Sequence, residues 1–379
     1  MREKKGETVK NTGKRTIPVD KAVGTVLAHD ITEIRPGEFK GRAFKKGHIV
    51  RKADISYLKR LGKENLFILK VKRDEMHEND AAFAIAKALA GNGVKLDGEP
   101  SEGRINLVAA REGLLKVDQE TLFKFNMLGE VMCATIHSNS VVKKGQLVAG
   151  TRAIPLVVKK SLIGKALRIA KKSKGVLNVK EIRKPRAGVV ITGNEVYYGR
   201  VRDAFTPVIK KKIKNVKGRI IGIYFAPDNI SYIKDRVNKL ITAGADLIIL
   251  TGGMSVDPDD VTRFAIRKMG VKEPVYGSPV LPGAMFLVAY VRAKAQKRRG
   301  TKGVNLKTSA LLKSRTSELI PVVGIPACGM YSSITVFDMI LPRVLAGEKI
   351  GRQELALLGH GGLCLKCKTC KYPVCPFGK

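Results

Sequence analysis

The sequence lacks tryptophan, and aromatic residues make up only 6% of its 379 residues. Proteins that bind single-stranded nucleic acid place stacking aromatic side chains between their cations. No such interleaving occurs here, and neither does a paired Cys/His finger or an aromatic RNA-binding strand motif. The absence of these features argues against a dedicated nucleic-acid site, although 71 Lys and Arg against 33 Asp and Glu give a net charge of +38.

Acidic residues are missing from two long stretches. Between Glu130 and Glu181 there are eleven Lys or Arg and no acid, and from Arg292 to Arg315 there are nine cations and no acid. We interpret most of these cations as solvated surface and expect nonspecific binding of polyanions at low salt. A nucleic-acid-binding protein that uses this basic surface stays open as an alternative.

The sequence also lacks an apolar run long enough to cross a membrane and lacks the apolar stretch of a signal peptide. We therefore expect a cytoplasmic protein with no membrane contact. Its 44% hydrophobic content and its length allow two or three domains with cores of their own.

Short apolar segments separated by Gly and Pro turns dominate residues 1–182, which predicts a β-rich α+β region with few helices. Helices are expected near 52–61, over 80–90 with Asp80 as the N-cap, and over 160–172. From residue 186 onward, strands at 188–192, 219–225, 246–250 and 321–325 alternate with helical segments. This alternation predicts a three-layer, doubly wound, mostly parallel α/β sheet over residues 183–350.

Four loops in this α/β segment follow predicted strands. They begin with Thr-Gly-Asn-Glu-Val at 192–196, Ala-Pro-Asp at 226–228, Thr-Gly-Gly-Met-Ser-Val-Asp-Pro-Asp-Asp at 251–260, and Gly-Ile-Pro at 324–326. Parallel strands end at one sheet edge, where α/β proteins bind ligands. We therefore expect these loops to meet.

The residue types in these loops suit an anion with a divalent cation. Gly252 and Gly253 allow a tight turn and let backbone N–H groups approach an anion. Glu195, Asp228, Asp257 and Asp260 offer hard oxygen ligands, and Thr192, Thr251, Ser255 and Thr262 offer hydroxyl donors.

Structural alternatives remain for several of these residues. Ser255 and the aspartates could cap the helix that follows, with Pro258 in its first turn. Asp228 could be a helix cap, and Glu195 an exposed turn residue. Four histidines, His29, His48, His77 and His137, are isolated in the sequence, which favours packed or solvent-facing roles for them.

These motifs resemble the molybdopterin-binding domain shared by molybdopterin molybdenumtransferases, their adenylyltransferase partners and gephyrin. The resemblance rests on the 192–196 loop, the stretch that ends at Asp228, the 251–256 loop with Asp260 and Thr262, and the Gly-Ile-Pro run at 324–326. It covers about residues 186–346 and keeps the order and spacing of the motifs.

The resemblance implies a function in molybdenum cofactor biosynthesis. A transferase of this family binds adenylylated molybdopterin and uses Mg²⁺ and molybdate to replace adenylate with molybdenum. Carried across, Glu195, Asp228 and Asp260 are the catalytic positions, Asp203 falls where the transferases also have an acid, and the cofactor-binding positions are Thr192, Gly193, Thr251, Gly252, Gly253, Ser255, Asp257, Gly324 and Pro326. An adenylyltransferase or a molybdoenzyme is the implied partner, and we expect a homo-oligomer.

The sequence departs from the family at several points. Residues 1–182 resemble the transferase's amino-terminal region only weakly and lack the Ser-Ala-Met-Asp-Gly-Tyr-Ala stretch of that region. Asp257 replaces a glycine, and the usual Gly-x-Pro-Gly-Asn-Pro run becomes Gly-Ile-Pro-Ala-Cys-Gly at 324–329. A noncatalytic carrier or sensor of the cofactor is therefore the alternative to an enzyme.

The last segment, residues 351–379, holds four of the six cysteines. Cys364, Cys367, Cys370 and Cys375 are spaced closely enough for one metal centre, and nearby lysines favour their thiolates. The spacing predicts a metal-binding tail that holds Zn²⁺ or an iron–sulfur cluster, and the sequence does not choose between them. A thiol-bearing tail without metal stays open, and Cys328 is expected to be a small packed residue.

Overall fold

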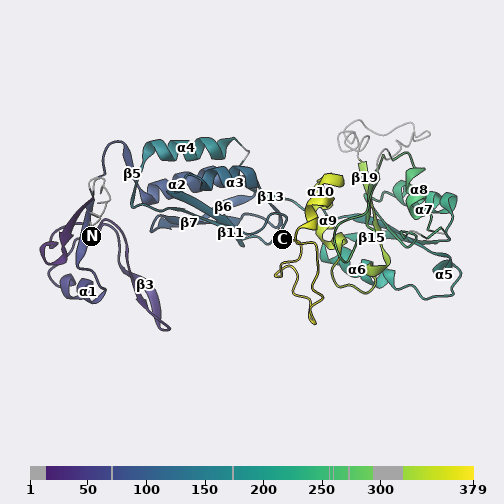
Figure 1. The fold of residues 1–379 in the computed structure, drawn as a ribbon, viewed down its shortest axis with the longest axis horizontal. Coiled ribbons are helices and arrows are strands. Elements are labelled where there is room, and N and C mark those ends of the chain that lie inside the picture. Colours follow the sequence, from purple (N-terminus) through teal and green to yellow (C-terminus); the bar gives the residue numbers. More distant parts are fainter. Residues whose placement is uncertain are drawn as a thin grey trace, which may run out of the picture. The chain divides into compact units, whose positions relative to one another are not determined.

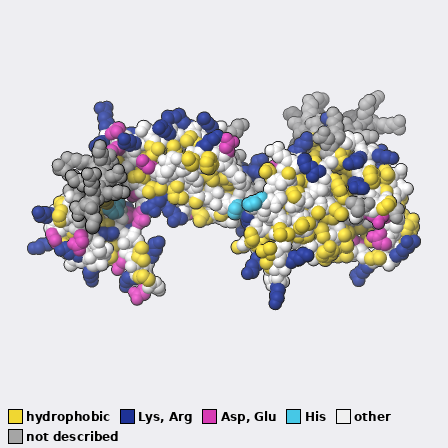
Figure 2. Space-filling model, in the orientation of Figure 1, with side chains coloured by type: hydrophobic (Ala, Val, Ile, Leu, Met, Phe, Trp, Pro, Cys, Tyr) yellow, Lys and Arg dark blue, Asp and Glu magenta, His cyan; other side chains and the backbone are white. Residues whose placement is uncertain are grey.

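The computed structural model describes residues 14–69, 71–172, 175–255, 257–258, 260–271, 274–292 and 319–379. It divides into two compact units, one of residues 1–138 and 142–180 and one of residues 139–141 and 181–379 (Figure 1). Lys and Arg side chains are spread over the visible face of both units, with far fewer Asp and Glu among them (Figure 2). None of the described helices is long and apolar enough to span a lipid bilayer.

Unit 1 begins with a small β-rich module. Its elements are β1 (Lys14–Pro18), η1 (Val19–Lys21), β2 (Ile31–Arg35), β3 (Phe39–Phe44), α1 (Asp54–Arg60) and β4 (Asn65–Leu69). β1 pairs antiparallel with β4, and β2 with β3. Val19, Leu27, Ile31, Leu58 and Leu66 form its buried core.

The rest of unit 1 packs helices on antiparallel sheets. The strands are β5 (Glu75–His77), β6 (Val94–Ser101), β7 (Arg104–Ala109), β8 (Gly113–Val117), β9 (Val131–Thr135), β10 (Val141–Val142), β11 (Leu147–Ala153), β12 (Val157–Lys159) and β13 (Leu177–Lys180). The largest sheet has the order β6-β7-β11-β9. The helices are α2 (Glu78–Leu89), α3 (Gln119–Asn126) and α4 (Lys160–Lys171).

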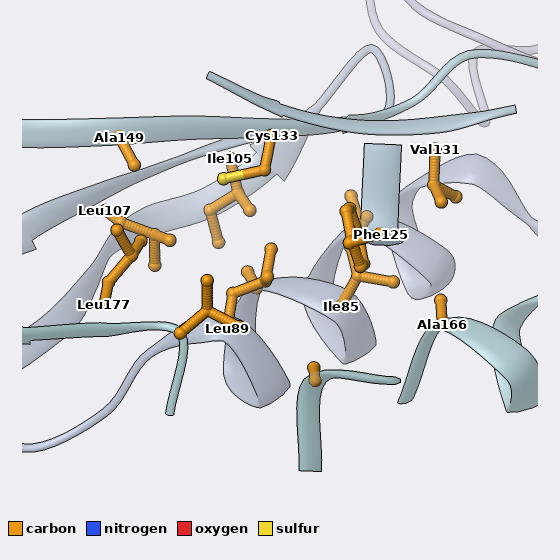
Figure 3. Close-up of a cluster of buried hydrophobic side chains, with 14 of the residues drawn as sticks. Ile85, Leu89, Ile105, Leu107, Phe125, Val131, Cys133, Ala149, Ala166 and Leu177 are labelled. Atoms are coloured by element: carbon orange, nitrogen blue, oxygen red, sulfur yellow. The ribbon is translucent and has the colours of Figure 1, made fainter. Parts of the chain in front are cut away.

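The core of this part lies between α2 and the sheet (Figure 3). Ile85 and Leu89, one helical turn apart on α2, are fully buried and belong to one cluster with Ile105 and Leu107 of β7. Each buried aliphatic side chain of this kind contributes about 2 kcal/mol to stability. The predicted β-rich α+β region is confirmed.

The start of α2 differs from the prediction. The helix begins at Glu78, and its N-cap is His77, whose Nδ1 accepts a hydrogen bond from the Asn79 backbone N–H at 3.2 Å. Asp80 therefore lies inside the first turn and is not the cap. Sequence periodicity missed this because an imidazole nitrogen replaces the usual capping oxygen.

Unit 2 contains a six-stranded sheet in the order β15-β14-β16-β19-β18-β17. The strands are β14 (Arg186–Thr192), β15 (Arg219–Ala226), β16 (Leu247–Thr251), β17 (Val275–Tyr276), β18 (Leu287–Arg292) and β19 (Leu319–Ile325). The first four in sheet order run parallel. β18 pairs antiparallel with β19, and β17 pairs antiparallel with β18, and neither strand was predicted from the sequence.

Helices cover both faces of this sheet. They are α5 (Asn194–Tyr197), α6 (Phe205–Asn215), α7 (Ile230–Thr242), α8 (Thr262–Arg267), η4 (Ala327–Gly329), α9 (Val336–Leu345), α10 (Arg352–Ala356) and η5 (Leu357–Gly359). Residues of α6 and α9 share one core with the sheet, and residues of α7 and α8 share the other. Because both faces are covered, β14 and β16 are apolar along almost their whole length. The predicted three-layer, mostly parallel α/β fold is confirmed.

The last residues of the chain belong to unit 2 and pack against its core. Phe377 is 3% exposed and shares a hydrophobic cluster with residues of α9. Burial raises the pKa of Tyr372 to about 12. Residues 361–379 are thus part of the folded unit.

Candidate functional site

A cleft of about 800 Å³ opens in unit 2 where the parallel strands end. Its walls come from the loops after β14, β16 and β19, from the 281–285 segment, and from the C-terminal residues 363–366. Of the predicted site residues, those that line the cleft are Thr192, Glu195, Gly252, Gly253, Ser255, Asp260 and Pro326. A cleft of this size suits a small organic ligand.

A buried pair of threonine hydroxyls fixes the ends of the strands. The Thr192 hydroxyl donates to the Thr251 carbonyl at 2.9 Å, and it lies 2.8 Å from the Thr262 hydroxyl, which donates to it in turn. All three residues are buried. These hydroxyls therefore tie β14, β16 and the start of α8 together.

The turn after β16 requires glycine at two positions. Gly252 and Gly253 have φ of 77° and 56°, a backbone conformation that favours glycine. A Cβ at Gly252 would lie 2.1 Å from the Thr192 carbonyl oxygen, and one at Gly253 would lie 2.3 Å from the Thr262 hydroxyl. The absence of side chains brings the backbone of the two strand ends into direct contact beside the cleft.

Two carboxylates line the cleft. Asp260 accepts a hydrogen bond from the Ser255 backbone N–H, which closes the loop that follows the glycine turn. Glu195 lies in the first turn of α5, and its carboxylate reaches back over Gly193, where a Cβ would lie 2.5 Å from Glu195 Oε1. The Asp260 carboxylate is thus held by a backbone hydrogen bond, and the Glu195 carboxylate lies against Gly193.

Asp228 does not line the cleft. Its carboxylate accepts a hydrogen bond from the Asn194 backbone N–H at 2.9 Å, while the Asn194 side chain accepts one from the Asp228 backbone N–H at 3.1 Å. Asp228 also does not cap α7, so the alternative of a helix-cap role for this acid is wrong. Asn229 is the cap, and its side chain accepts from the Tyr232 backbone N–H at 3.0 Å.

Four further predicted site residues, Gly193, Thr251, Asp257 and Gly324, support the cleft without lining it. Gly324 lies in β19, where a Cβ would lie 2.5 Å from the Met254 methyl carbon, and the Asp257 carbonyl accepts from the Asp260 backbone N–H at 3.0 Å. Asp203 accepts from the backbone N–H groups of Phe205 and Thr206 at the start of α6. This is a capping role for that acid. Asp259, Val256 and the basic stretch 293–315 lie outside the described residues.

The structure adds two cations and a thiol that sequence reasoning did not assign to the site. Arg202, Lys366 and Cys364 line the cleft, together with Cys328, which was expected to be packed but is only half-buried. Burial raises the pKa of the Cys328 thiol above its ordinary value. Among 71 Lys and Arg, neither cation carries a sequence signal of its own, because its position depends on how distant segments fold together.

All four tail cysteines line a second cavity of about 330 Å³. This cavity adjoins the cleft, since Pro282, Tyr331 and Cys364 are among the residues that line both. Within the described ranges, no three His, Cys, Asp or Glu side chains are grouped closely enough to hold a metal ion. The metal-binding tail therefore stays a prediction.

Comparison with known families and sequences finds two regions of similarity. Residues 188–346 match the family model described as probable molybdopterin binding domain, and residues 16–70 match one described as a domain of unknown function, DUF8806.

The CinA-like protein of Mycobacterium leprae (strain TN) is 34% identical over 89 residues, which are 22% of this chain and 21% of that protein. The CinA-like protein of Thermosipho melanesiensis is 31% identical over 88 residues, 23% of this chain and 22% of that protein. The chain thus spans about a fifth of the length of these curated relatives.

Comparison with solved structures finds matches that include two proteins from Pyrococcus furiosus. The tungsten cofactor synthesizing protein MoaB is 13% identical, with a TM-score of 0.30 over 44% of this chain and 97% of that chain. A molybdenum cofactor biosynthesis protein is 14% identical, with a TM-score of 0.24 over 90% of this chain and 64% of that chain.

Proposed function

We propose that the cleft of unit 2 binds molybdopterin in molybdenum cofactor biosynthesis, because residues 188–346 match the family model described as probable molybdopterin binding domain. One observation carries the proposal. The glycine turn after β16 lines the same cleft as Ser255 and Arg202, so backbone, hydroxyl and guanidinium groups can surround one phosphate. The apolar remainder of the cleft suits the flat pterin ring.

We further propose that the bound compound is adenylylated molybdopterin and that the protein inserts molybdate with the help of Mg²⁺. Mg²⁺ in such sites is held by one or two carboxylates together with substrate phosphates. Glu195 and Asp260 line the cleft and fit this requirement, and they are the residues that would hold the ion. When bound, Mg²⁺ would neutralise charge on the phosphate that leaves. The glycine turn and Arg202 would orient that phosphate.

A reaction with purified protein tests this proposal. The chain is incubated anaerobically with adenylylated molybdopterin, molybdate and Mg²⁺, and active cofactor is measured by reconstitution of a molybdoenzyme apoprotein. Formation of active cofactor that is lost in Asp260→Ala supports the enzyme. Tight binding without turnover would instead assign the protein as a carrier or sensor, and absence of binding would contradict both.

The tail cysteines are a second proposed site, for Zn²⁺ or an iron–sulfur cluster. All four line one cavity, and Cys367 and Cys370 are exposed, so their side chains can turn toward Cys364 and Cys375. Metal and acid-labile sulfide analysis of protein purified without oxygen tests this proposal. One equivalent of zinc, or iron with sulfide, lost on replacing Cys367 and Cys370 by Ser, supports it, and metal-free protein contradicts it.

A further inference from the structure

The C-terminal segment forms one wall of the cleft. Leu363, Cys364 and Lys366 line it together with the loops at the strand ends. These residues lie beyond residue 346, where the match to the molybdopterin-binding family ends. Their contribution to the cleft is therefore a feature of this chain that the family match does not cover.

Backbone hydrogen bonds hold this wall in position. The Leu281 backbone N–H donates to the Gly362 carbonyl at 2.8 Å, and the Cys364 backbone N–H donates to the Leu281 carbonyl at 2.9 Å. Leu281 and Leu363 thereby form a parallel β-bridge. Because Leu281 itself lines the cleft, the bridge places the tail directly at its rim.

The end of the tail is fixed independently. The Gly378 backbone N–H donates to the Gly361 carbonyl at 2.9 Å, and a Cβ at Gly378 would lie 2.7 Å from the Met339 methyl carbon of α9. Phe377 is buried in the same core. Both ends of the segment between these anchors are therefore held by contacts within unit 2.

Lys366 has an unusual backbone in this loop. Its φ is 50°, in the left-handed region that costs a residue with a Cβ about 1 kcal/mol or more. Strained residues of this kind concentrate at binding sites, where the surrounding structure holds them in place. Lys366 combines this conformation with a position in the cleft wall, and its side chain carries a mobile ammonium group.

We propose that Lys366 binds an anionic group of the ligand in the cleft, so that the tail completes the binding site. This inference rests on the proposed function. Arg202 and Lys366 come from distant segments, and together they supply two cations to one cleft. Two cations suit a ligand with two negative groups, such as a phosphoanhydride, better than a ligand with one. The tail would thus favour the adenylylated form of the pterin over the free form.

Binding to the full chain tests this inference. The affinities of molybdopterin and of adenylylated molybdopterin are measured anaerobically for the unmodified protein, Lys366→Ala and Lys366→Gly. We expect each variant to bind the adenylylated compound about tenfold more weakly, since a charge-assisted contact is lost. The affinity for free molybdopterin should fall by a smaller factor. Glycine fits a φ of 50° without strain, so Lys366→Gly separates loss of charge from loss of backbone order.

Lys368→Ala provides the matched control, because Lys368 is exposed in the same loop and lines neither cavity. It should bind as the unmodified protein does, and Lys366→Arg should keep most of the affinity. Added salt should weaken binding by the unmodified protein more than binding by Lys366→Ala. Equal affinity of Lys366→Ala, Lys366→Gly and the unmodified protein would overturn the inference while leaving the proposed function intact. Failure of the unmodified protein to bind either compound would overturn the proposed function itself.

Discussion

The two compact units of this chain place their carboxylates in different settings. In unit 2, Glu195 and Asp260 line an open cleft, where their charge is available to a guest. In unit 1, Glu78 is only 6% exposed in the first turn of α2, and burial raises its pKa to about 7, with Arg152 opposing the rise and Glu102 adding to it. A carboxylate at a cleft can serve a ligand, whereas a buried one lowers stability whenever it is ionised.

A similar contrast exists within unit 2. Asp228 and Asp260 both follow parallel strands at the same sheet edge, yet only Asp260 lines the cleft. Asp228 instead exchanges hydrogen bonds with Asn194. An acid at a strand end therefore has a structural or a ligand-facing role depending on which neighbouring loop lies opposite it.

The largest effect is expected from Gly252→Ala. This variant tests whether the structure around the cleft depends on the backbone contact between the strand ends. The new Cβ would lie 2.1 Å from the Thr192 carbonyl oxygen at a φ of 77°, so the turn must move. We expect the free energy of unfolding to fall by about 3 kcal/mol, measured by urea denaturation. Gly270→Ala is the control, because Gly270 has a φ of 81° with nothing within 4 Å of the added Cβ. It should cost only about 1 kcal/mol, and equal losses would contradict the steric argument.

Asp260→Asn and Asp228→Asn test the contrast between the two acids of unit 2. Asparagine keeps a hydrogen-bond acceptor in both loops but removes the charge. If the proposed reaction takes place, Asp260→Asn should lower kcat/KM about 100-fold, or about 2.7 kcal/mol of transition-state stabilisation. Asp228→Asn should stay within about threefold. Comparable losses in steady-state assays would show that Asp228 takes part in the chemistry despite its position outside the cleft.

Glu78→Gln tests the buried acid of unit 1. In the folded chain the pKa of Glu78 is about 7, which lies above the ordinary value of 4.5. Between these two pH values the folded state keeps a proton that the unfolded state has already released. The stability linked to Glu78 is therefore fully present below about pH 4.5 and is lost as the pH rises through 7. The variant should be about 2 kcal/mol more stable than the unmodified chain near pH 8, with the difference vanishing near pH 4 in thermal or urea unfolding. A difference that does not change with pH would show that ionisation of Glu78 is not the cause.

The smallest effect is expected from Thr192→Val, which removes a hydroxyl that ties the strand ends together. The Thr251 carbonyl and the Thr262 hydroxyl would each lose a partner in a buried place, at a cost of about 1.5 kcal/mol in unfolding free energy. Thr242→Val, at an exposed position near the end of α7, should change stability by less than about 0.5 kcal/mol. If both variants were neutral, the hydroxyl pair would not stabilise the site.

The sequence predicted the elements of unit 2 where a long apolar pattern determines them. The apolar spacing of Ile230, Ile233, Val237, Leu240 and Ile241 predicts one face of a helix, which is α7 in the structure. Ile233, Val237 and Leu240 are buried in it, and Ile230 and Ile241 are partly buried. Strands β14 and β16 were also predicted, because parallel strands covered on both faces read as continuous apolar runs.

Choices between neighbouring polar residues could not be made from the sequence. Asp228 and Asn229 are equally good caps locally, and the opposing Asn194 backbone decides which side chain turns to the helix. The positions of Arg202 and Lys366 in the cleft likewise depend on contacts between segments far apart in the chain. The charge and spacing of these residues did not distinguish them from other cations.

The hydroxyl pair of Thr192 and Thr262 affects both the rate and the affinity with which the proposed ligand would bind. Strand ends that are already held together lose little freedom when a ligand enters, so this part of the site costs little conformational entropy on binding. Such a preorganised receptor should accept its guest in a single rapid step, without a slow rearrangement after the first encounter.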